Sequence, residues 1–225
     1  TAICRRLAAA GHHVIVHAGR SRAKADAIVG DILAAGGSAE AVAFDVTDRV
    51  ATAVALAALL EKGAIQILVN NAGIHADAVF PAMSGEQWDS VVAVSLNGFF
   101  NVTQPLTLPM IRTRWGRIIT ISAVAGITGN RGQVNYSAAK GALHAASKAL
   151  ALELASRGIT VNAVAPGIIA TGMSEGAFDA EAVRSLVPMK RAGQPDEVAD
   201  LVAFLASEQA AYISGQVISI NGGMI

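Results

Sequence analysis

The sequence has one cysteine, few aromatic residues, few charged residues and no excess of either charge. Cys4 cannot form an internal disulfide on its own, which fits a reducing, cytoplasmic compartment. The 17 basic and 17 acidic side chains cancel to a formal charge of zero, which argues against electrostatically driven binding to nucleic acid or to a membrane surface. No uninterrupted apolar run approaches the roughly 20 residues that span a bilayer.

What the sequence does contain is a large apolar fraction. Hydrophobic residues make up 53% of the chain and charged residues 15%, a composition that favours a packed core over disorder. No linker, charge block or internal repeat divides the 225 residues. We therefore expect a single domain over residues 1–225.

Strand-like and helix-like segments alternate along the chain. Short β-branched runs predict strands at 13–17, 41–44, 65–69, 117–121, 160–165 and 216–220. Helical spacing predicts helices at 2–10, 22–34, 50–60, 85–111, 136–156 and 196–206. Several strands are apolar nearly throughout, as strands covered on both faces should be. The pattern predicts an α/β fold with a doubly wound parallel sheet, a Rossmann-like domain.

The first residues form a predicted helix, whereas such a sheet normally starts with a strand and a Gly-rich turn that holds phosphate. Nothing of that kind precedes Thr1. Either the fold lacks this unit, or a strand and turn of roughly 15–20 residues lie outside the sequence. We expect the second, because removing a central strand would expose the edges of two neighbouring strands.

Tyr136 and Lys140 are four residues apart on a predicted helix and project from the same face. A nearby ammonium favours the phenolate and is expected to lower the pKa of a tyrosine, which would make it a usable acid and base. Taken alone, the pair also fits a tyrosine at a helix start with a solvated lysine one turn later.

Three polar segments follow successive predicted strands: Asn70-Asn71-Ala72-Gly73, Ser122 and Pro166-Gly167. The carboxyl ends of parallel strands meet at the crevice where open α/β sheets bind ligands. With Tyr-x-x-x-Lys at 136–140, these motifs have the order and spacing of the short-chain dehydrogenase/reductase family, which the whole chain resembles.

Within that family the sequence is most similar to the 3-oxoacyl-acyl-carrier-protein reductases, through residues 116–121, 129–136, 155–167 and 220–223. The resemblance implies reduction of a 3-oxoacyl thioester on acyl carrier protein by a nicotinamide cofactor, in fatty-acid, polyene or polyketide synthesis. It also implies a homotetramer. Tyr136 would donate the proton, and Lys140 would hold the nicotinamide ribose and lower the pKa of the tyrosine.

Two positions depart from the family's catalytic pattern. The family's serine, thirteen residues before the tyrosine, is Ala123 here, a lost hydrogen-bond donor to the substrate oxygen that would be expected in an inactivated variant. Ser122 is a poor replacement because neighbouring side chains on a strand point to opposite faces. The family's water-ordering asparagine corresponds to Ser95, whose hydroxyl can still hold a relay water, while Asn97 is about 200° round a helix from that position.

The segment after the predicted strand 13–17 contains Arg20, Ser21 and Arg22 and no acidic residue. An acidic residue there selects NAD, so two guanidiniums predict NADP(H); the alternative is that both arginines are only solvated. The resemblance adds further cofactor contacts at Asp45, Val46, Asn71, Ala72, Gly73, Pro166, Gly167, Ile169 and Thr171. Asp45 could instead cap the helix that follows it.

Arg114 and Arg157 correspond to arginines with which these reductases engage their acidic carrier protein. A neutral enzyme needs such a local basic patch to attract a partner of opposite charge, although two surface arginines are also common. The five histidines show no zinc spacing, and Trp88 and Trp115 are expected to anchor packing.

Two other functions remain open from the sequence. The chain could reduce a free alcohol, sugar or steroid substrate as a different short-chain reductase. It could also be a catalytically silent subunit that binds the cofactor, as Ala123 and Ser95 suggest. Turnover on carrier-bound and free substrates distinguishes these alternatives.

Overall fold

The computed structural model describes residues 1–171 and 179–225 of the chain. Its strands are all parallel and form two sheets. In one, β1 (His13–Ala18) pairs with β2 (Ser38–Ala43). In the other, the order is β3 (Ile67–Asn70), β4 (Gly116–Ile121), β5 (Ile159–Pro166) and β6 (Val217–Ile220). This arrangement confirms the predicted α/β fold class.

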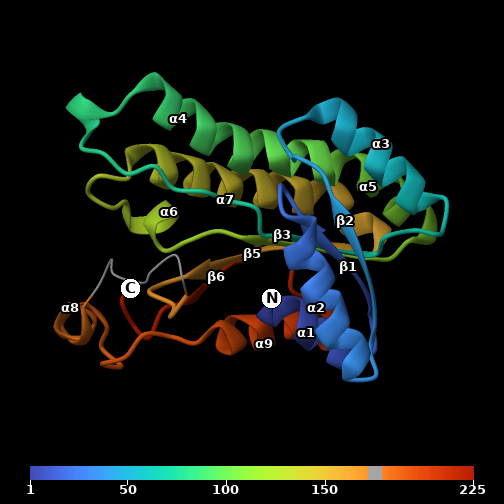
Figure 1. Cartoon of the computed structure of the whole chain (residues 1–225). Coiled ribbons are helices and arrows are strands. Elements are labelled where there is room, and N and C mark those ends of the chain that lie inside the picture. Colours follow the sequence, from blue (N-terminus) through green and yellow to red (C-terminus); the bar gives the residue numbers. More distant parts are fainter. Residues whose placement is uncertain (172–178) are drawn as a thin grey trace.

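Helices cover both faces of the strands (Figure 1). One layer contains α3 (Arg49–Leu60), α4 (Gly85–Val92), α5 (Gly98–Thr113) and α7 (Val134–Leu154). The other contains α1 (Ala2–Ala9), α2 (Arg22–Ala34) and α9 (Pro195–Ala206). Within the described residues, no helix is both long and apolar enough to cross a membrane.

The central strands are buried on both faces, which explains why they read as nearly continuous apolar runs. Neighbouring residues of β4 serve different layers: Ile118 packs in a core with α3, α5 and α7, and Ile119 packs in a core with α1, α2 and α9. This two-residue alternation determines which of the two helical layers each side chain of the strand contacts.

Most predicted elements are confirmed to within a few residues. One prediction is wrong: the single helix expected at 85–111 is interrupted by a π-helical turn, η2 (Ala93–Asn97). The sequence reading also missed two short helices, α6 (Ala125–Thr128) and α8 (Ala180–Leu186), which are too short for helical periodicity to show.

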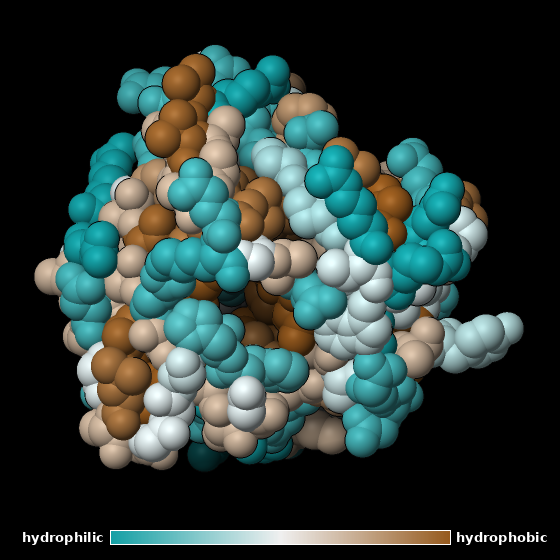
Figure 2. Space-filling model, turned by 90° about the vertical axis from the view of Figure 1, so that its right-hand side faces the viewer, coloured by the Kyte–Doolittle hydropathy of each residue, from teal (hydrophilic) through white to brown (hydrophobic). Residues whose placement is uncertain are grey.

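A cavity of about 1940 Å³ runs between the two sheets and continues to the carboxyl ends of the strands. Val14 and Val16 of β1 and Ile67 and Val69 of β3 line it. Figure 2 shows an opening into the molecule with hydrophobic surface inside and hydrophilic residues around it. Among the described strands, β1 and β3 each hydrogen-bond to one neighbour only. The strand and Gly-rich turn expected before Thr1 stay a prediction.

Candidate active site

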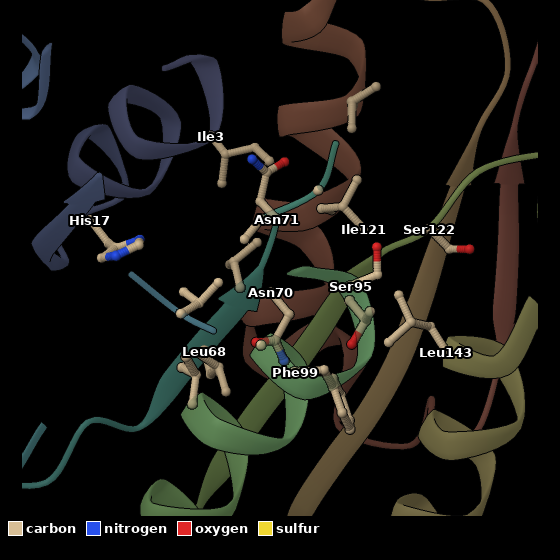
Figure 3. Close-up of a pocket in the computed structure, with 18 of the residues that line it drawn as sticks. Ile3, His17, Leu68, Asn70, Asn71, Ser95, Phe99, Ile121, Ser122 and Leu143 are labelled. Carbon is tan, nitrogen blue, oxygen red and sulfur yellow. The ribbon is translucent and has the colours of Figure 1, made fainter. Parts of the chain in front are cut away.

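The candidate site lies where β3, β4 and β5 end and α7 begins. Residues from all four elements line the cavity there, together with the π-helical turn η2. Figure 3 shows Asn70, Asn71, Ser95 and Ser122 in this region, with His17 of β1 across the cavity. The structure therefore brings together the strand-end motifs that the sequence placed at one crevice.

Lys140 is the point where these elements meet. Its Nζ lies 5.6 Å from the centroid of the Tyr136 ring and donates a hydrogen bond to the Ile121 carbonyl at 2.8 Å. A Cβ added to Gly73 would lie 3.2 Å from the same Nζ, closer than ordinary van der Waals contact. Gly73 thus lets the backbone after β3 approach the ammonium, so that this segment, the end of β4 and Tyr136 meet at one buried cation.

The pKa of Tyr136 shifts in the direction opposite to the expected one. Burial and then the Asp77 carboxylate raise the pKa of the Tyr136 phenol above its ordinary value, so the expectation that Lys140 lowers it is wrong for this structure. The Lys140 ammonium lies over the ring and bonds to the Ile121 carbonyl, and its charge does not reverse the effect of burial on the pKa of Tyr136. Tyr136 therefore keeps its proton at neutral pH and is available as a proton donor.

Burial also lowers the pKa of Lys140, to about 8. The charged form therefore dominates below pH 8 and is lost as the pH rises through that value. The other titratable groups close to it are Tyr136, whose raised pKa keeps it neutral, and His144, whose lowered pKa keeps it neutral as well. Lys140 is thus the group of this cluster that changes charge in the mildly alkaline range.

We expect kcat/KM for reduction to fall above about pH 8, with the slope of a single proton loss, because the lysine acts as a cation. Steady-state rates between pH 6 and 9.5, with stability checked at each pH, measure this. A profile that stays flat through pH 9 would contradict the assignment of Lys140 as the titrating group.

The Ser122 hydroxyl is committed to α7 and not to the cavity. It donates to the Lys140 carbonyl at 3.0 Å, and its Oγ lies 2.6 Å from His144 Nε2. Since the hydroxyl proton goes to the carbonyl, we assign the Nε2 proton to a bond from His144 to Ser122. Ala123 also lines the cavity, but its methyl group can donate nothing. This geometry agrees with the interpretation of Ser122 as a poor replacement.

Ser95 lies in the π-helical turn η2, and such turns often occur at functional sites. The residue is 2% exposed, lines the cavity, and its Oγ has no hydrogen-bond partner among the described residues. A buried hydroxyl without a partner costs roughly 1–3 kcal/mol, so a bound water or ligand would be favoured beside it. Asn97 is exposed and does not line the cavity. Ser95 therefore stays the better candidate for a relay water.

Most of the proposed cofactor residues line the same cavity, but Ser21 and Arg22 do not. Arg20 lines it, whereas Arg22 does not and forms an ion pair of 3.2 Å with Asp26. Ser21 precedes α2 as its N-cap without a side-chain cap bond. The two predicted arginines are therefore not equivalent, and Arg20 is the one available to a ligand.

Asp45 both lines the cavity and shapes the loop after β2. Its Oδ1 accepts hydrogen bonds from the Thr47 N–H and the Thr47 hydroxyl, which lower the pKa of the carboxyl and keep it charged. The N-cap of α3 is Asp48, whose side chain accepts from Ala51 N. The alternative role of Asp45 as that cap is thus wrong, and its second oxygen remains for a ligand.

The segment after β5 closes the other side of the cavity. A Cβ added to Gly167 would lie 2.7 Å from the Asn221 Cβ, so only glycine fits against the end of β6. Ile169 pairs with Gly193 in an isolated bridge, and Thr171 lines the cavity. The groups along this path are a guanidinium, a carboxylate, the backbone of the segment after β3 and apolar side chains. It fits the phosphates, polar edges and rings of a dinucleotide.

Arg114 and Arg157 lie close together but far from the site. Arg114 donates to the Ser156 carbonyl at 3.1 Å, and both arginines precede strands, at the edge opposite to Tyr136. Tyr136, near the start of α7, and Arg157, just beyond its end, are 21 positions apart, about 30 Å at 1.5 Å per residue. The structure therefore does not bring the expected docking residues to the catalytic side chains of the same chain.

A polar cluster beside Tyr136 was missed in the sequence. Gln133 donates to Asp77 at 2.8 Å and accepts from Asn130 at 2.9 Å, and all three residues line the cavity. The only signal available was the position of Gln133, three residues before Tyr136 on the same helical side. Within the described residues, no three His, Cys, Asp or Glu side chains gather as a metal site would require.

Comparison with known proteins now decides the family. A family model described as "Enoyl-(Acyl carrier protein) reductase" matches residues 1–225. The chain is 45% identical to "3-oxoacyl-acyl-carrier-protein reductase FabG" of Aggregatibacter actinomycetemcomitans, over 99% of this chain and 93% of that protein. The chain belongs to the short-chain dehydrogenase/reductase family.

Other members of the family are about equally similar. The 3-oxoacyl-acyl-carrier-protein reductase of Synechocystis is 45% identical over 97% of this chain and 89% of its own length. Nodulation protein G of Azospirillum brasilense is 44% identical over 100% of this chain and 92% of its own length. Membership of the short-chain dehydrogenase/reductase family places the chain among the oxidoreductases.

Proposed function

We propose that this short-chain dehydrogenase/reductase reduces a 3-oxoacyl thioester on acyl carrier protein to the 3-hydroxyacyl thioester, with NADPH as the reductant. The observation that carries the proposal is the buried Lys140 cation between Tyr136, Gly73 and the end of β4. The names of the relatives support the substrate class. The pathway would be fatty-acid, polyene or polyketide synthesis.

Each protein group has a separate task in this reaction. The cofactor, when bound, supplies a hydride to the carbonyl carbon. Tyr136 donates its phenolic proton to the carbonyl oxygen, which its raised pKa permits at neutral pH. Lys140 places a positive charge beside the ring, and Ser95 offers a buried hydroxyl to a water that can return a proton. The cofactor would be held by Arg20, Asp45, Val46, Asn71, Ala72, Gly73, Pro166, Gly167, Ile169 and Thr171.

The reaction is tested by comparing NADPH oxidation on a 3-oxoacyl-carrier substrate, on the corresponding free thioester and on simple ketones. The proposal predicts the highest kcat/KM on the carrier-bound substrate. Equal or higher kcat/KM on a free alcohol, sugar or steroid substrate would support the alternative short-chain reductase instead.

Arg20→Ala is expected to weaken NADPH binding by about 10- to 100-fold and to leave NADH binding nearly unchanged. The loss corresponds to one charge-assisted hydrogen bond to the 2′-phosphate, worth roughly 1.5–3 kcal/mol. Arg22→Ala is the matched control, because Arg22 is paired with Asp26 and does not line the cavity. Titration of both cofactors measures the effect. Equal losses for NADPH and NADH would remove Arg20 from 2′-phosphate recognition.

Arg114 and Arg157 would dock the acyl carrier protein in the proposed reaction. Since about 30 Å separates Arg157 from Tyr136, a carrier bound there serves catalysis only next to the site of another copy. A homotetramer, which we also propose, would provide such copies.

Charge reversal of Arg114 and Arg157 together is expected to raise KM for carrier-bound substrate several-fold and to spare small free thioesters, because only the carrier needs the basic patch. Arg112→Glu with Arg131→Glu serves as a control of equal charge change. If both substrates suffer alike, or the control acts equally, these arginines do not dock the carrier.

Ala123 favours a second candidate, a cofactor-binding subunit without turnover. The missing hydroxyl removes a donor at the place where negative charge develops, and Ser122 does not replace it. That function predicts stabilisation by NADPH against thermal unfolding with no oxidation of NADPH on any 3-oxoacyl substrate. Measurable turnover would rule it out.

A further inference from the structure

The side-chain amide of Gln133 is held in one orientation beside Tyr136. Its Nε2 donates to Asp77 Oδ2 at 2.8 Å, and its Oε1 accepts from Asn130 Nδ2 at 2.9 Å. Because an ionised carboxylate can only accept, the end of the amide that bonds to Asp77 is the nitrogen. Nε2 carries two protons, and among the described residues only one of them has a partner. One N–H donor therefore remains for a ligand.

The backbone around this amide is fixed on both sides. Ala78 N donates to the Gly132 carbonyl at 2.9 Å. Asn135, which is fully buried, donates through Nδ2 to the carbonyls of Ala76 and Gln87 at 2.9 and 3.0 Å. These bonds tie the segment after Gly73 to the loop that begins α7. Gln133 is thus supported by ordered structure, as a donor that acts in catalysis should be.

The cavity that Gln133 lines lacks a hydrogen-bond donor at Ala123. Gln133, Ala123 and Tyr136 line the same cavity. Ala123 has no donor, the Ser122 hydroxyl is committed to α7, and the Thr128 hydroxyl donates to backbone carbonyls. A carbonyl oxygen that accepts the proton of Tyr136 needs a second donor while negative charge develops on it.

We propose that Gln133 Nε2 donates the second hydrogen bond to the carbonyl oxygen of the 3-oxoacyl substrate, with Asp77 and Asn130 as positioning residues. This inference rests on the proposed function and assigns the hydrogen-bond donor that Ala123 cannot supply. The Asp77 charge opposes a free oxyanion, but transfer of the Tyr136 proton neutralises the oxygen in the same step. Burial, and then the same carboxylate, raise the pKa of Tyr136 and so keep the phenol protonated before the reaction.

The test is Gln133→Leu, which keeps the approximate size of the side chain and removes the donor. We expect kcat to fall by about 10²-fold, the usual effect of removing one such donor. NADPH affinity and thermal stability with NADPH should stay within about two-fold and a few degrees of the unmodified chain, since Gln133 does not hold the cofactor. Gln104→Leu, at an exposed position of α5, is the matched control and should retain full activity.

A second pair of variants separates donation from structure. In the Ala123→Ser background the new hydroxyl supplies the donor, so Gln133→Leu should cost less than about tenfold there. Asp77→Ala leaves the glutamine but frees its amide, and should lower kcat by an intermediate factor even if Gln133→Leu folds poorly.

Unchanged kcat in folded Gln133→Leu, or equal fold-losses in both backgrounds, would overturn the assignment. If the unmodified chain reduces no 3-oxoacyl substrate, the proposed function fails and this inference fails with it. If the chain reduces the substrate and Gln133→Leu does so equally well, the inference alone fails.

Discussion

Tyr136→Phe is expected to lower the rate of 3-oxoacyl reduction by about 10²–10⁴-fold, the range of general acid catalysis. The phenol is the proton donor in the proposed reaction, and burial together with Asp77 keeps it protonated at neutral pH. The ring remains in the variant, so its contact with Lys140 and the fold of α7 should persist. The loss should therefore appear in kcat, while NADPH affinity changes only a few-fold.

The chain provides a matched control for this experiment. Its only other tyrosine, Tyr212, is fully exposed and outside the cavity. Tyr212→Phe removes the same hydroxyl group and should leave kcat unchanged. Single-turnover rates with saturating NADPH compare the two variants. A Tyr136→Phe protein that turns over at the unmodified rate would exclude Tyr136 as the acid.

Ala123→Ser is expected to raise kcat by at least tenfold, with little change in NADPH affinity. A donor to a developing oxyanion is typically worth about 10²–10³ in kcat, or roughly 2.7–4 kcal/mol. Part of that gain is already supplied if Gln133 donates to the same oxygen, so the lower end is expected. An effect on kcat without one on binding is typical of an interaction made mainly in the transition state.

Ser122→Ala is the control that shows which of the two neighbouring residues, 122 or 123, presents its side chain to the substrate. Because the Ser122 hydroxyl bonds to the Lys140 carbonyl and His144, its loss should lower the free energy of unfolding by about 1–3 kcal/mol and should change kcat little. NADPH oxidation and chemical denaturation of both variants measure these effects. No gain from Ala123→Ser, combined with lost activity in Ser122→Ala, would show that Ser122 is the working hydroxyl.

The fold could be predicted because its strands are buried on both faces and because strand-like and helix-like segments alternate clearly along the chain. The β-branched run at 117–121 and the motif at 70–73 locate β4 and the end of β3, and parallel strands bring those ends together. The same logic located Tyr136, Lys140, Gly73 and Gly167 at one site. Sequence motifs were enough to locate a residue where its position depends on a single helix or strand.

Other features depend on contacts between distant segments. The pKa of Tyr136 is raised because the fold buries it near Asp77, and a local Tyr–Lys spacing does not report that environment. The π-helical turn that isolates the Ser95 hydroxyl leaves the helical hydrophobic pattern almost unchanged. Neither of these could be derived from the sequence alone.

Transfer of isotope from the cofactor tests the central claim most directly. The chain is incubated with NADPH that carries deuterium at both C4 positions and with a 3-oxoacyl-carrier substrate, and the product is analysed by mass spectrometry. The account predicts a 3-hydroxyacyl-carrier product with one deuterium on C3, formed at a much lower rate by Tyr136→Phe. Binding of NADPH and of the carrier without any labelled 3-hydroxyacyl product would contradict it.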